Sequence, residues 1–187
     1  MALRIKSHWH NEESERSLEE VGSALAFNAW RVAKDKAINL HGEDFVYDND
    51  QQRMGVIGEY LIFQVQVVDR MVHDSLELDH EARRVLIVSF VKGLAGHMQD
   101  NCSDIMGPGN YGSDFIAKCN ERASEYAEFA FNESDGPSYP FYRHLGHEIQ
   151  QIMGSTGENR WVIDQVMDKD APDIAKKMMR TIVDLME

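Results

Sequence analysis

Proline is scarce in this sequence: only four are found among 187 residues, at positions 108, 137, 140 and 172. A proline inside a helix removes a backbone hydrogen bond and breaks the helix, so long segments of this chain are free to be helical. Pro140 and Pro172 stand where a helix could begin, because the first helical turn tolerates proline. The sequence therefore predicts an all-α protein.

Cysteine and basic residues are also few. The two cysteines, Cys102 and Cys119, follow neither a C-x-x-C nor a zinc-site spacing. Nineteen Lys and Arg stand against 32 Asp and Glu, which gives a net charge of −13. Proteins that bind nucleic acid gain most of their affinity from basic side chains on phosphates. We therefore expect no nucleic-acid partner.

Long hydrophobic runs are missing as well. The most apolar stretches, Met54–Val72 and Val85–Met98, are interrupted by charged and amide side chains and are too polar to span a membrane. The first residues contain no apolar segment typical of a signal peptide. We expect a soluble, cytoplasmic protein without a membrane partner.

Common catalytic motifs are absent from the sequence. It contains no Walker A loop and no G-x-S-x-G, and the glycine-rich loop Gly107–Gly112 lacks the lysine and the strand-to-helix context that a phosphate loop requires. We therefore assign no catalytic residue and predict no cofactor, with a divalent metal as the alternative. The interpretation leans against an enzyme.

Capping signals and apolar periodicity predict one domain over residues 1–187, with 1–13 as an N-terminal arm. About six or seven helices form a bundle around a central antiparallel hairpin of Gln51–Leu76 and Asp79–Asn101. Leu61–Val67 alternates like a strand, but each arm of the hairpin exceeds 20 residues, which favours helix. Further helices are expected at about Ser17–Gly42, Ser113–Phe131, Pro140–Gly154, Asn159–Met167 and from Asp170 to the C-terminus.

Two glycines, Gly93 and Gly96, fall inside the predicted third helix. Glycine there costs helix stability, so we expect another helix to cross closely at both positions.

The predicted second helix carries a polar stripe that includes Glu59 and His73, which we interpret as a solvent-exposed edge. Glu59 and His73 are too far apart along the helix to share an ion. Asp69 and His73, four residues apart, form a weaker candidate metal pair.

The stronger metal candidate is the cluster of His144, His147 and Glu148, whose i, i+3 and i+4 spacing lets side chains hold one ion. The segment almost matches H-E-x-x-H, but Gln151 replaces the second histidine, so a zinc-protease assignment fails. The nearby run of Glu121, Glu125 and Glu128 is interpreted as a solvated helix face, and the sequence does not contain the two Glu-x-x-His motifs that a di-iron bundle requires.

The predicted first helix is apolar on two sides. One stripe has core spacing, whereas Phe27, Trp30 and Ile38 gather on the opposite side. A second copy of the chain could cover these three side chains, or the arm carrying Leu3, Ile5 and Trp9 could do so.

Two functional hypotheses remain. The first is a helical protein that acts through protein contacts and forms a homodimer through Phe27, Trp30 and Ile38. The alternative is a protein that binds a divalent metal or a small molecule.

Overall fold

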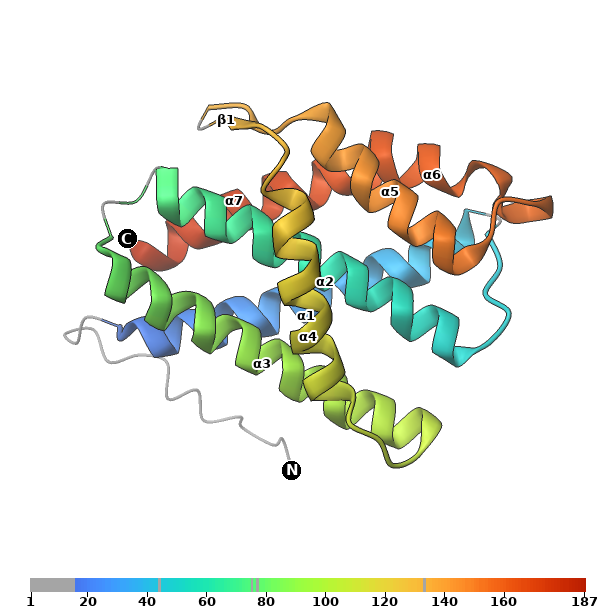
Figure 1. Cartoon of the computed structure of the whole chain (residues 1–187), viewed down its shortest axis with the longest axis horizontal. Helices are drawn as coiled ribbons and strands as arrows, with labels where there is room; N and C mark the ends of the chain where they lie inside the picture. Colours follow the sequence, from blue (N-terminus) through green and yellow to red (C-terminus); the bar gives the residue numbers. More distant parts are fainter. Residues whose placement is uncertain (1–15, 44, 75, 77, 133) are drawn as a thin grey trace, which may run out of the picture.

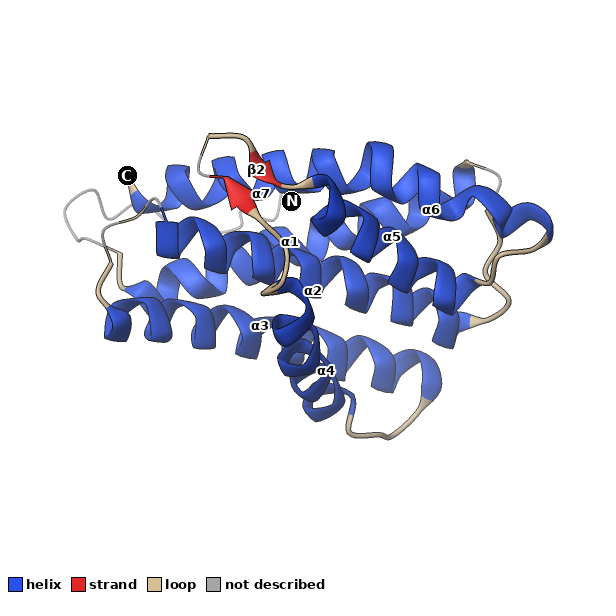
Figure 2. Ribbon diagram, turned by 45° about the horizontal axis from the view of Figure 1, so that its top comes forward, coloured by secondary structure: helices blue, strands red, loops and turns tan. Residues whose placement is uncertain are grey.

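The computed structural model describes residues 16–43, 45–74, 76, 78–132 and 134–187 and confirms the all-α prediction (Figures 1 and 2). The predicted arm at residues 1–13 lies outside the described residues. The elements run in the order α1 (Leu18–Gly42), α2 (Asp50–Asp74), α3 (His80–Met106), α4 (Tyr111–Tyr126), β1 (Phe131–Asn132), β2 (Gly136–Pro137), α5 (Tyr139–Met153), the 3₁₀ helix η1 (Gly157–Trp161), α6 (Val162–Gln165), the π-helical turn η2 (Val166–Asp170) and α7 (Ala171–Met186).

The two helices that begin with a side-chain cap start where the sequence predicts. The Ser17 hydroxyl accepts from the Glu20 amide at 3.2 Å, and Glu20 accepts from the Ser17 amide at 2.9 Å, the predicted capping box. Asp79 caps α3 by accepting from the Ala82 amide at 2.8 Å. Such caps satisfy backbone donors that the helix itself leaves free.

Other boundaries differ from the prediction. α3 continues to Met106, and α4 begins at Tyr111 without a side-chain cap rather than behind Ser113. α4 ends at Tyr126, and the residues after it form the short antiparallel hairpin β1–β2, which pairs Phe131 with Pro137. Gly136 permits this turn because its φ of 79° lies in the left-handed region.

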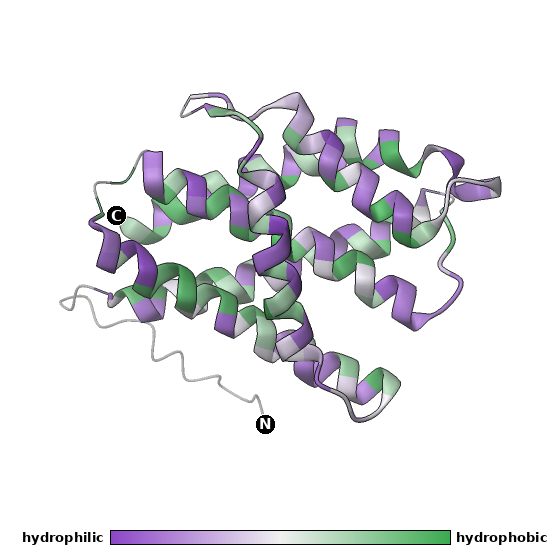
Figure 3. Ribbon diagram, in the orientation of Figure 1, coloured by the Kyte–Doolittle hydropathy of each residue, from purple (hydrophilic) through white to green (hydrophobic). Residues whose placement is uncertain are grey.

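α2 forms the centre of the molecule. It is buried along nearly its whole length, from Met54 to Val72, and contacts α1, α3, α4, α5 and α7. α4 crosses α2 and α3 at a steep angle in Figure 1. In Figure 3, hydrophobic and hydrophilic segments alternate along the outer helices, as expected when each helix buries one side. The alternation of Leu61–Val67 therefore belongs to a helix that is buried all round.

α1 and α3 approach each other through small residues. A Cβ at Gly93 would lie 2.6 Å from the Cβ of Ala26, and one at Gly22 would lie 2.7 Å from the Cβ of Ser89. The close crossing expected at Gly93 is thus confirmed. At Gly96 the expectation is wrong: no atom of another described helix lies within 4 Å of the place a Cβ would take.

The C-terminal segment joins α6 to α7 through the π-helical turn η2 without an intervening loop. The last residue of η2, Asp170, is buried, and its carboxylate accepts from the Tyr60 hydroxyl at 2.8 Å and from Lys36 at 3.4 Å. These bonds tie α1 and α2 to the C-terminal segment.

Within the described residues, no helix combines the length and the apolar character needed to cross a membrane.

Candidate functional site

A cluster of charged side chains lies where α2, α4 and α5 meet. Its innermost member is Glu59 of α2, whose side chain is 0% exposed. Both Glu59 oxygens accept from Arg122 of α4, at 3.3 Å from Nε and 3.2 Å from Nη2, and Lys118 Nζ lies 2.6 Å from Glu59 Oε1. The interpretation of Glu59 as part of a solvent-exposed edge is therefore wrong. Helical phase alone could not show that α4 covers this side of α2.

Arg122 connects three carboxylates. Its Nη1 donates to both oxygens of Glu125, at 3.0 and 2.9 Å, and its Nη2 also donates to Glu148 of α5. Burial lowers the pKa of Arg122, but the hydrogen bond and charge of Glu59, with the charges of Glu148 and Glu125, raise it by more. The guanidinium therefore stays charged and holds the three carboxylates together.

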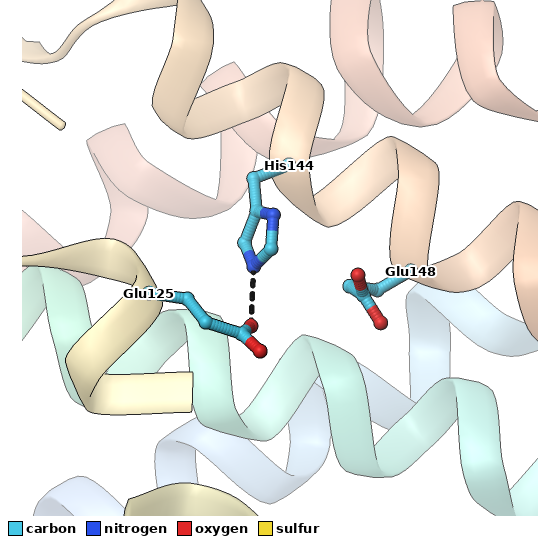
Figure 4. A group of neighbouring side chains, drawn as sticks. All are labelled: Glu125, His144 and Glu148. Carbon is cyan, nitrogen blue, oxygen red and sulfur yellow. Dashed lines mark hydrogen bonds and ion pairs between the residues drawn. The ribbon is translucent and has the colours of Figure 1, made fainter. Parts of the chain in front are cut away.

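His144 of α5 completes the cluster (Figure 4). Its Nε2 lies 2.9 Å from Glu125 Oε2, and its side chain is only 14% exposed. One ligand atom each from Glu125, His144 and Glu148 lies within 4.8 Å of the others. Two helices thus bring two carboxylate oxygens and one imidazole nitrogen to one place.

Tyr126 lies beneath the cluster with an unpaired hydroxyl. The side chain is 1% exposed, its ring meets the His144 ring edge-on at 4.8 Å, and the hydroxyl finds no hydrogen-bond partner among the described residues. Burial raises the pKa of Tyr126 well above its usual value, and the charge of Glu59 raises it further. The phenol is therefore a protonated donor close to the carboxylates. A buried polar atom without a partner is costly and is uncommon in native proteins.

The structure brings together only part of the set proposed from sequence. His144 and Glu148 meet in the cluster, whereas His147 is exposed and lines a neighbouring cavity of about 400 Å³ with Tyr139 and Arg143. Glu125 takes the place expected for His147. The interpretation of the whole glutamate run of α4 as solvated is therefore wrong at Glu125, although Glu121 and Glu128 are exposed.

The second candidate pair, Asp69 and His73, has other partners in the structure. Asp69 accepts from Arg83 Nε at 2.9 Å and Nη2 at 2.7 Å, a two-pronged pair between α2 and α3. His73 Nδ1 instead lies 2.6 Å from Asp74, its neighbour in sequence. Both side chains already have partners in separate interactions.

The predicted interface on α1 is only partly open. Phe27 is 55% exposed and Ile38 is 58% exposed, whereas Trp30 is half-buried and stacks on His97 of α3 with ring centroids 5.3 Å apart. His97 is thus partly buried. The use of Phe27, Trp30 and Ile38 as a dimer interface remains a prediction.

Comparison with known proteins adds no relative: no family model, curated protein or solved structure matches this chain. Its chemistry must therefore be argued from the cluster itself. Glu59, Glu125 and Glu148 carry three negative charges and Lys118 and Arg122 carry two positive ones, so −3 + 2 leaves −1 while His144 is neutral. A partly buried excess charge of this kind favours a further cation.

Proposed function

We propose that the protein binds a divalent transition-metal ion between α4 and α5, with Glu125, His144 and Glu148 as its protein ligands. The observation that carries the proposal is the convergence of their three ligand atoms within 4.8 Å of one another. Oxygen and imidazole ligands without a thiolate suit Zn²⁺, Mn²⁺ or Fe²⁺. Three protein ligands leave a coordination position for water, as in catalytic rather than structural metal sites.

The charge of the cluster supports an additional cation. With neutral His144 the cluster carries one uncompensated negative charge, and a metal would supply positive charge beside Glu125 and Glu148. The ion would replace the hydrogen bond between His144 Nε2 and Glu125 Oε2, with the imidazole proton moved to Nδ1, and protons would compete with the ion for the three ligand atoms as the pH falls.

Arg122 is the internal competitor of the metal. Its guanidinium already donates to Glu125 and Glu148, so an ion at those oxygens must displace these two contacts. Arg122 would keep Glu59, to which it donates through two nitrogens. Glu125 and Glu148 can therefore change partner from Arg122 to the metal while Glu59 stays paired with Arg122.

The experiment is a titration of the protein with Zn²⁺ and Mn²⁺ by calorimetry, together with metal analysis after dialysis. Every variant carries His8→Ala and His10→Ala, because these two imidazoles are close enough in sequence to chelate metal themselves. The test variants are His144→Ala and Glu125→Gln. The matched controls are His147→Ala, three residues away on α5, and Glu121→Gln, one turn away on α4.

We expect one ion per chain, about 100-fold or more weaker binding in the two test variants, and unchanged binding in the two controls. An equal loss of metal affinity in His144→Ala and His147→Ala would favour the ligand set His144, His147 and Glu148, proposed from sequence, over the set that contains Glu125. The absence of stoichiometric metal in the unsubstituted cluster would overturn the proposal and leave Arg122 as its permanent cation.

A second candidate function rests on α1. Two large apolar side chains, Phe27 and Ile38, are more than half exposed on one face of this helix, which supports self-association through it. We propose that this face pairs with its copy in a homodimer. Light scattering of the protein and of Phe27→Ser/Ile38→Ser tests it. A dimer that becomes a folded monomer supports the pairing, and a monomeric unsubstituted protein contradicts it.

A further inference from the structure

An apolar cavity lies between α2, α3 and the first half of α4. Its volume is about 500 Å³, within the range typical of small-molecule sites. Methionines dominate its walls, with Met54 from α2 and Met98 and Met106 from α3, and Phe115 of α4 adds an aromatic face. Methionine is flexible and polarisable and adapts to ligands of different shape.

Glycine keeps this cavity open. Gly58 of α2 lines it, and a Cβ at this position would contact only the end of Met98, at 3.7 Å. A larger side chain at Gly58 therefore has room to extend into the cavity. A substitution at Gly58 can therefore fill the cavity without a clash with the backbone of a neighbouring helix.

The charge available in the cavity is negative. Lys118 lines it, but its ammonium lies 2.6 Å from the buried Glu59, which neutralises it. Asp114, one helical turn earlier on α4, also lines the cavity, and no described side chain pairs with its carboxylate. The C-terminal end of α3, at Met106, contributes partial negative charge and the N-terminal end of α4, at Tyr111, partial positive charge, so the net unpaired charge at the cavity is that of the exposed Asp114.

We infer that this cavity binds a small organic cation, an amine carried on an apolar or aromatic body, with Asp114 as the partner of the ammonium group. The methionines and Phe115 would bury the body of the ligand, and the charged end would stay at the rim beside Asp114. The inference is independent of the metal proposal, because it uses neither Glu125, His144 nor Glu148.

The test compares three probes that share one body and differ in charge: 4-phenylbutylamine, 4-phenylbutanol and 4-phenylbutyrate. Protein labelled with ¹³C at the methionine methyl groups reports where each probe binds. Met54, Met98 and Met106 line the cavity, whereas Met178 is buried in α7 and serves as an internal control. The variants are Asp114→Asn, Gly58→Leu and, as a matched control on the exposed side of α3, Asp104→Asn.

We expect the amine to bind about fivefold more tightly than the alcohol, with shifts at the three cavity methionines, and the acid to bind most weakly. Asp114→Asn should lower the affinity of the amine to that of the alcohol, and Asp104→Asn should leave it unchanged. Gly58→Leu should abolish binding of all three probes while its circular dichroism stays helical.

Three results would overturn the inference. Tightest binding of the acid would mean that Lys118 leaves Glu59 and recognises an anion. Shifts that do not distinguish the cavity methionines from Met178 would mean that the probes bind elsewhere or not at all. A change from dimer to monomer in Gly58→Leu, measured by light scattering, would mean that a second copy of this chain fills the cavity.

Discussion

The contact of α1 with α3 and the contact of α4 with α2 and α5 are built from opposite chemistry. Small residues such as Ala26 and Gly93 let the backbones of α1 and α3 come close together. α4 meets its neighbours through charged side chains and an open cavity in addition to the buried side chains of Phe115, Cys119 and Tyr126. Close packing between α1 and α3 leaves no room for a ligand, whereas the junction of α4 offers both polar ligands and space.

This difference predicts that the two regions respond differently to solution conditions. Close packing acts at short range and depends little on salt or pH. A network of charges responds to both, and to any cation that competes for its carboxylates. The contact of α4 with α2 and α5 is therefore where a change of solution conditions or a ligand is expected to act, and the α1–α3 contact should be insensitive to both.

The largest effect is expected at Arg122. Arg122→Met leaves the buried Glu59 with Lys118 alone and removes donors from Glu125 and Glu148, which should cost about 3–5 kcal/mol in the free energy of unfolding. Urea denaturation followed by circular dichroism measures this loss.

An exposed arginine provides the control. Arg84, whose side chain is 59% exposed, pairs only with its neighbour Glu81 one turn away, and Arg84→Met should change stability by about 0.5 kcal/mol or less. The double variant Arg122→Met/Glu59→Met should regain most of the lost stability, because the buried carboxylate is removed together with its partner. A similar cost for the two arginines would show that the cluster contributes no more than a surface pair.

A smaller effect, of opposite sign at two positions, is expected on α3. Gly93→Ala places a Cβ 2.6 Å from that of Ala26 and should destabilise the protein by about 1–2 kcal/mol. Gly96→Ala meets no neighbouring helix and should stabilise it by up to about 1 kcal/mol, because alanine favours helix. Thermal unfolding of both variants measures the difference. Stabilisation by both would mean that α1 and α3 can separate at little cost.

The last test leaves the charged cluster intact and measures how often α4 separates from its neighbours, through the reactivity of the buried Cys119 on that helix. Burial, with a contribution from the charge of Asp69, raises the pKa of the Cys119 thiol to about 11. At pH 8 the thiolate is then about 100-fold or more rarer than in a free cysteine, so iodoacetamide should react slowly with Cys119 in a Cys102→Ser background. The rate should rise about tenfold per pH unit towards pH 11, and in urea it should reach that of a free thiol. Rapid reaction in native protein at pH 8 would show that α4 detaches readily.

Local sequence signals account for much of the fold. Ser17 and Asp79 could be recognised as caps because a helix start is defined by residues within one turn. The C-terminal end of α3 was harder to place, since the helix continues to Met106 where α4 packs against it. No short-range signal required the hairpin that pairs Phe131 with Pro137.

The cluster illustrates what sequence reasoning could not reach. His144 and Glu148 were identifiable because they are four residues apart on one helix. Glu59 of α2 and Glu125 of α4 join them from other helices, and their own helical phases place them on polar stripes. The pairing of Arg122 with Glu125 at i, i+3 was the one local sign that this side of α4 is organised.

The π-helical turn η2 also limits which insertions and deletions the gene could accept. A π turn holds one residue more than an α-helical turn, and each residue added to a helix rotates the rest of that helix by about 100°. Val162 before the turn, Val166 at its start, and Ile174, Met178 and Ile182 after it are all buried, although a regular helix of the same length would turn Val162 and Ile174 to different sides. Deletion of one residue between Val166 and Asp170 would give a regular helix in which Val162 and Ile174 lie about 20° apart, so α7 would keep its buried face. A deletion between Ile174 and Met178 would instead rotate the rest of α7 by about 100° and turn Met178 and Ile182 away from the core. Within this uninterrupted helical segment, the π turn is therefore the place where the loss of one residue is expected to be tolerated.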